Sequence, residues 1–95
     1  MENSNTIYLI FRCDEWKSTD KMVLLTATKS TRKLKNLVED QIRSGDMTYD
    51  YGDKDKSVTD QIRLFRTDFR SSTISEMNTH LEYGYIEAIS DGQIR

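Results

Sequence analysis

The amino-acid sequence predicts an α+β domain in which a small three-stranded sheet carries helices on one face, in the order β-β-α-α-α-β. Short apolar segments with β-forming residues stand near both ends of the chain, and segments with helical spacing of apolar residues stand between them. The length of 95 residues allows one modest hydrophobic core. We therefore expect residues 1–95 to form a single domain.

Two strands are expected before the first helix. Over Thr6–Cys13 the odd-numbered side chains are all apolar and point to one side, which is typical of a central or partly covered strand. Lys21–Thr28 is the second predicted strand, and strict alternation places Val23, Leu25 and Ala27 on one face. The polar residues 14–21 between the strands are expected to form a loop around Trp16.

The best-specified element is a helix over Thr31–Ser44. Ser30 or Thr31 can cap its start, and Gly45 can adopt the left-handed conformation that ends it. Its apolar residues recur at helical spacing on one face and are Leu34, Leu37, Val38 and Ile42. The acidic loop that follows, residues 46–56, is expected to be a loop or a short exposed strand.

Two further helices and a third strand complete the prediction. The second helix begins at Ser57 or Thr59, and its predicted buried stripe is Val58, Ile62, Phe65 and Phe69. A capping box over Thr73–Glu76 starts the third helix, which Gly84 is expected to end; its predicted inner face is Ile74, Met77 and Leu81. The third strand is Tyr85–Ile89, and Asp91–Gly92 is a turn signal.

Composition and charge exclude several classes of function. The net charge of −2 argues against nucleic-acid binding through overall charge, although a local basic patch remains compatible with it. A single cysteine, Cys13, excludes an internal disulfide and a zinc site with four thiolate ligands. With no signal-peptide pattern and no long apolar run, we expect a cytoplasmic protein without a membrane span.

No catalytic residue, cofactor or metal is predicted. A Cys13–His80 nucleophilic pair is formally open, but Cys13 alternates with core residues and His80 is expected to be exposed. The acidic loop does not form an EF-hand, because a loop counted from Asp46 has Thr48 at the third position and Tyr51 at the sixth.

The acidic loop is instead predicted to contact a partner. Tyrosine supplies contact area at low entropic cost, and carboxylates complement a basic partner. The predicted contact residues of this loop are Tyr49, Asp50, Tyr51, Asp53 and Asp55.

Trp16 is the sixth predicted contact residue, and two interpretations of it are open. Its indole either folds back as a lid over the sheet, which we favour, or protrudes as an interface anchor.

Basic residues form a second candidate surface. Lys29, Arg32 and Lys33 cluster at the start of the first helix, and Arg63, Arg66 and Arg70 follow at helical spacing on the second. These six residues form either an anion-binding or phosphate-binding surface or a solvated basic face.

The opening segment Ile7–Ser18 and the closing segment Leu81–Gly92 resemble small proteins of phages and mobile elements of low-GC Gram-positive bacteria. That group includes anti-CRISPR and other anti-defence inhibitors. The resemblance implies a non-enzymatic inhibitor in the bacterial cytoplasm that binds a host protein, for example a nucleic-acid-handling defence enzyme. The alternative is a nucleotide or oligonucleotide binder that uses the basic helix surfaces, and a homodimer through the open face or edge of the sheet is also compatible with the fold.

Overall fold

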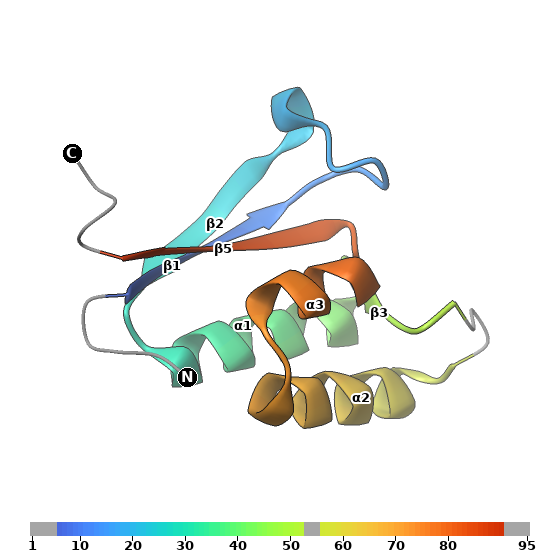
Figure 1. Cartoon of the computed structure of the whole chain (residues 1–95). Coiled ribbons are helices and arrows are strands. Elements are labelled where there is room, and N and C mark those ends of the chain that lie inside the picture. Colours follow the sequence, from blue (N-terminus) through green and yellow to red (C-terminus); the bar gives the residue numbers. More distant parts are fainter. Residues whose placement is uncertain (1–5, 53–55, 91–95) are drawn as a thin grey trace.

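Three helices lie on one face of a three-stranded antiparallel sheet in the computed structural model of the chain, which describes residues 6–52 and 56–90 (Figure 1). The strands are β1 (Thr6–Arg12), β2 (Val23–Thr28) and β5 (Gly84–Ser90), and the sheet order is β2-β1-β5. The predicted α+β class is confirmed, and β1 is the central strand as expected. The predicted order of elements holds only roughly, because two short strands are added, one between α1 and α2 and one after α3.

The helices form two tiers below the sheet. Helix α1 (Thr31–Ser44) packs against β1 and β2, and α3 (Ile74–His80) packs against β5 (Figure 1). Helix α2 (Val58–Ser71) packs on α1 and α3 and lies farther from the sheet. The core lies between the sheet and the helices and consists of Tyr8, Ile10, Leu34, Val38, Ile42, Met47, Tyr49, Ile62, Phe65, Met77, Leu81 and Ile86.

A bulge in β2 overturns one predicted alternation. Ile10 lies opposite Thr26 but Phe11 lies opposite Leu24, so Leu25 is an extra residue on the β2 side. The prediction that Val23, Leu25 and Ala27 share a face is therefore wrong. Strand β2 also begins later than predicted, because residues Thr19–Lys21 form a short 3-10 helix, η1.

Helix α1 has the predicted bounds, because both of its ends are specified locally. The Ser30 hydroxyl accepts a hydrogen bond from the Lys33 N–H at 3.1 Å, and Gly45 ends the helix at a φ of 86°. Leu34, Val38 and Ile42 are buried as predicted, and Leu37 is half-buried against the core.

Helices α2 and α3 begin where the caps predict. Ser57 caps α2, and the capping box of Thr73 and Glu76 starts α3. Ile62 and Phe65 of the predicted α2 stripe are buried, but Val58 is 43% exposed because it stands in the first turn, so its predicted burial is wrong.

Helix α3 ends at His80 and not at Gly84. Leu81–Glu82 form strand β4, which pairs with β3 (Thr48–Tyr49) in a second, two-stranded sheet. Strand pairing thus replaces part of the acidic loop. Gly84 is needed for a close approach, since a Cβ there would lie 2.5 Å from the Met47 sulfur. The predicted turn at Asp91–Gly92 lies outside the described residues.

Candidate functional site

Residues 47–50 of the acidic loop pack into the protein. Tyr49 is 0% exposed, and its hydroxyl donates a hydrogen bond to Asp68 Oδ2 at 2.6 Å. Asp50 is also buried, and its Oδ1 accepts the Gly52 N–H at 2.7 Å. The prediction that Tyr49 and Asp50 contact a partner is therefore corrected: these side chains stabilise the fold.

Tyr51 has a mixed role. It is 53% exposed, but its hydroxyl donates to both Asp68 oxygens at 2.8 and 2.7 Å, and its ring packs on His80 with a centroid separation of 4.0 Å. The hydrogen bond to Asp68 raises the pKa of Tyr51 to about 12. The pKa of Tyr49 is raised even more, mainly because its hydroxyl is buried and secondly because it also donates a hydrogen bond to Asp68. Asp53 and Asp55, the other two predicted contact residues of this loop, lie outside the described residues.

The cysteine and the histidine lie in different surroundings. Cys13 is buried as predicted, and desolvation raises the pKa of its thiol. His80 is half-buried against Tyr49 and Tyr51, so its predicted exposure is wrong. Within residues 6–52 and 56–90, no three His, Cys, Asp or Glu side chains are grouped closely enough to hold a metal ion. None of the helices in the same ranges is long and apolar enough to cross a membrane.

Trp16 points into solvent, so the lid interpretation is wrong. The indole is 77% exposed, the highest exposure among the large hydrophobic side chains of the described chain. It stands in the Trp16 loop, residues 13–22, which connects β1 to β2.

The Trp16 loop is held by hydrogen bonds on both sides of the indole. Asp14 Oδ1 accepts the Ser18 N–H at 2.9 Å, and this bond is the main cause that lowers the pKa of Asp14. Lys17, at a φ of 54°, turns its ammonium group inward to donate to the Asn78 carbonyl at 2.6 Å. The loop therefore presents Trp16 from a fixed backbone.

A groove of about 570 Å³ lies where this loop meets the sheet face that the helices leave open. Phe11, Tyr85 and Glu87 form its floor, because Phe11 lies opposite Tyr85 in the register of β1 and β5 and Glu87 follows on the same face. Lys17, Thr19 and Met22 form its wall.

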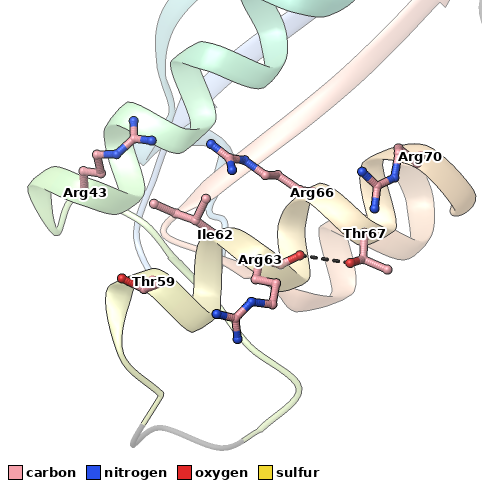
Figure 2. A pocket seen from close by; sticks show the side chains of 7 residues that line it. All are labelled: Arg43, Thr59, Ile62, Arg63, Arg66, Thr67 and Arg70. Carbon is pink, nitrogen blue, oxygen red and sulfur yellow. Dashed lines mark hydrogen bonds between the residues drawn. The ribbon is translucent and has the colours of Figure 1, made fainter.

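The predicted basic residues separate into two groups. Lys29, Arg32 and Lys33 are exposed around the start of α1, and none of them lines a described pocket. Arg63, Arg66 and Arg70 project from α2 into one pocket, together with Arg43 from α1 (Figure 2). This arginine pocket measures about 460 Å³, and its other lining residues are Thr59, Ile62 and Thr67.

The buried carboxylate of Glu39 pairs with two arginines of the arginine pocket, Arg66 and Arg43. Glu39 is 3% exposed and accepts hydrogen bonds from Arg66 Nε and Nη2, both at 2.9 Å. Lys35 and Arg43 also pair with it, at 3.0 and 3.4 Å. Hydrogen bonds from Arg66 first, and then from Lys35, lower the pKa of Glu39 to about 2, so it stays ionised and fixes the Arg66 guanidinium.

Sequence reasoning missed Glu39 and Arg43. The available signal was local, because Glu39 and Arg43 stand four residues apart on the same side of α1. The contact of Glu39 with Arg66 joins residues 27 positions apart and depends on how α1 packs on α2.

Comparisons with known proteins give no relative: no protein-family model, no curated protein and no solved structure matches this chain.

Proposed function

We propose that this is a small non-enzymatic binding protein that inhibits a host protein by contact, in the cytoplasm of a bacterial cell, as anti-CRISPR and other anti-defence proteins do. The observation that carries the proposal is the 77% exposure of Trp16 on a loop whose backbone is fixed on both sides.

An exposed tryptophan on a fixed loop is suited to anchoring an interface. Tryptophan is enriched among the residues that dominate binding energy, because its large ring buries much apolar area in a partner's pocket. A loop that is already held, by the Asp14–Ser18 and Lys17–Asn78 bonds, loses little further conformational freedom when it binds. The Trp16 loop thus replaces the acidic loop as the proposed contact surface.

The charges around Trp16 indicate the chemistry of the partner. Glu15 and Asp20 are exposed against one exposed cation of the loop, Lys21, while Lys17 is turned inward onto Asn78. An indole flanked by carboxylates fits a basic surface, such as the groove in which a nucleic-acid-handling enzyme holds phosphates. We therefore propose a partner of that kind.

An affinity pull-down tests this proposal. The tagged protein is immobilised, exposed to nuclease-treated lysate of a Gram-positive bacterium, and its retained proteins are identified by mass spectrometry. We expect the wild type to retain a protein in stoichiometric amount, and both Trp16→Ala and the Glu15→Lys/Asp20→Lys double variant to lose it. Asp14 is left unchanged because its carboxylate holds the loop.

Val58→Ala is the matched control, since Val58 is an exposed apolar residue on a different element. It should retain the same protein as the wild type. Because Trp16 projects into solvent, Trp16→Ala should change the free energy of unfolding by no more than about 0.5 kcal/mol. Equal retention by Trp16→Ala would rule out Trp16 as the anchor.

A further inference from the structure

The arginine pocket concentrates positive charge on a chain whose net charge is −2. Four arginines and Lys35 lie at or beside the pocket, and within residues 6–52 and 56–90 three carboxylates pair with them: Glu39, Asp40 and Asp60. Five cations against three carboxylates leave two positive charges in excess at this place.

The pairing leaves hydrogen-bond donors directed at the pocket. Arg66 uses Nε and Nη2 on Glu39 and keeps Nη1 for a ligand. Arg63 uses Nη1 on Asp60, and within the described ranges Arg70 has no hydrogen-bond or ion-pair partner. Arg70 thus keeps all of its donors free of other described residues, beside Arg66, which the buried Glu39 carboxylate holds in place. This arrangement favours binding of an anionic ligand, because the arginines do not use all of their donors in ion pairs within the part of the chain that the structure describes.

The spacing of the arginines indicates an extended ligand. Arg63 and Arg70 stand seven residues apart on α2, which corresponds to about 10 Å along the helix axis. Figure 2 shows Arg63, Arg66 and Arg70 following one another along α2, with Arg43 beyond Ile62 at the other side. A single phosphate cannot meet all four groups, whereas a chain of linked phosphates can.

The remaining lining residues indicate that the pocket suits phosphate groups and not nucleic-acid bases. Thr59 and Thr67 offer hydroxyl groups, and Ile62 is the apolar contribution. Among the residues that the structure describes, no aromatic side chain lines the pocket, so they give it no platform on which a base would stack. Guanidinium groups match phosphate oxygens in a planar, two-pronged geometry.

We propose that the arginine pocket binds a chain of phosphate groups through charge and guanidinium hydrogen bonds, without reading bases. Two sources share this chemistry: the backbone of a single-stranded nucleic acid and inorganic polyphosphate. The site is separate from Trp16, so it stands whether or not the proposed inhibition is correct.

Fluorescence anisotropy tests the proposal with two labelled probes, an oligothymidylate of about 15 nucleotides, a length that covers a typical single-strand site, and inorganic polyphosphate. If about three phosphates are contacted, raising the salt from about 50 to about 200 mM should weaken oligothymidylate binding roughly twentyfold. Binding of the oligothymidylate alone identifies the nucleic-acid backbone, and binding of polyphosphate alone or of both probes identifies the phosphate chain itself. Binding of neither probe at the lower salt concentration would overturn the proposal.

Arg70→Gln is the decisive variant, because Arg70 supports no described contact in the fold. It should weaken binding roughly five- to tenfold and reduce the magnitude of the log–log salt slope by about 0.7. Arg32→Gln is the matched control, since Arg32 is an exposed arginine at the start of α1 outside the pocket. Equal effects of the two variants, or displacement of the probe by a polyglutamate peptide of the same charge, would contradict a phosphate site here.

Discussion

Asp68 connects the acidic loop to α2 through two tyrosines. Its carboxylate is buried and accepts hydrogen bonds from the hydroxyls of Tyr49 and Tyr51. Because a hydrogen bond to a buried charge is worth more than one to a neutral group, these contacts stabilise the packing of the loop on the helices.

Tyr49→Phe and Tyr51→Phe should therefore differ in cost. We expect Tyr49→Phe to lower the free energy of unfolding by about 1.5–3 kcal/mol, because it removes a donor from a carboxylate that has little access to water. Tyr51→Phe should cost only about 0.5–1 kcal/mol, since water can reach the half-exposed site. Urea denaturation measures both values, and a larger loss for Tyr51→Phe would contradict the assignment.

Glu39 gives the stability of the protein a specific dependence on pH. Its folded pKa of about 2 lies below the ordinary value of 4.5, so the ionised form is favoured in the folded state. A group with a lowered folded pKa contributes stability above its unfolded pKa and loses that contribution as the pH falls through the folded value.

The Glu39→Gln variant tests this dependence. Above pH 4.5 the variant should be less stable than the wild type by roughly 2–3 kcal/mol, and the difference should shrink toward zero as the pH approaches 2. Urea denaturation at a series of pH values measures the difference. A difference that stays constant down to pH 2 would show that Glu39 contributes packing and not charge.

Side-chain contacts between residues close in the sequence could be predicted, and contacts between residues far apart in the sequence could not. The caps at Ser30, Ser57 and Thr73 were predictable because each acts within three residues of its partner. The burial of Tyr49 was not, since Asp68 stands 19 positions later and meets it only after α2 packs. The exposure of Trp16 was also missed, because a polar loop alone does not show which way its one large apolar side chain turns.

At the scale of elements, α3 closes part of the free edge of the sheet. The Asn78 side chain donates to the Ile86 carbonyl at 2.8 Å and accepts the Ile86 N–H at 3.0 Å. The side chain thus makes the two hydrogen bonds that a neighbouring strand would make to an edge strand. The three strands of the main sheet were predictable from their short apolar segments, but this contact and the β2 bulge, which breaks the predicted alternation, depend on tertiary packing.

Asn78→Ala should loosen the outer edge of β5. We expect the free energy of unfolding to fall by about 1–2 kcal/mol, because two half-buried backbone groups lose their partners. The Ile86 amide should exchange its hydrogen faster. Asn36→Ala, at an exposed position of α1, is the control and should leave both quantities unchanged. Unchanged exchange at Ile86 in Asn78→Ala would contradict the role of Asn78.

At the scale of the whole molecule, the two proposed surfaces lie in different layers. The Trp16 loop extends from the sheet, and the arginine pocket lies mainly on α2, the tier farther from the sheet (Figure 1). One surface combines an indole with carboxylates and the other carries excess positive charge. We expect ligands to occupy them without direct contact.

The effects of variants on the two surfaces should therefore be independent. Trp16→Ala should leave phosphate-chain binding unchanged within about 0.5 kcal/mol, and Arg70→Gln should leave protein retention unchanged, because sites without shared contacts behave additively. Parallel anisotropy and pull-down measurements on both variants check this expectation. Loss of both activities in either variant would indicate one continuous surface.

Acrylamide quenching of tryptophan fluorescence tests the central claim most directly, because Trp16 is the only tryptophan in the chain. In the free protein, we expect quenching nearly as efficient as that of a free tryptophan derivative, since the indole is 77% exposed. Adding the protein retained in the pull-down, prepared with a non-fluorescent tryptophan analogue, should protect Trp16 and reduce the quenching severalfold. Inefficient quenching in the free protein would contradict the exposed indole, and unchanged quenching in the complex would contradict its role as the anchor.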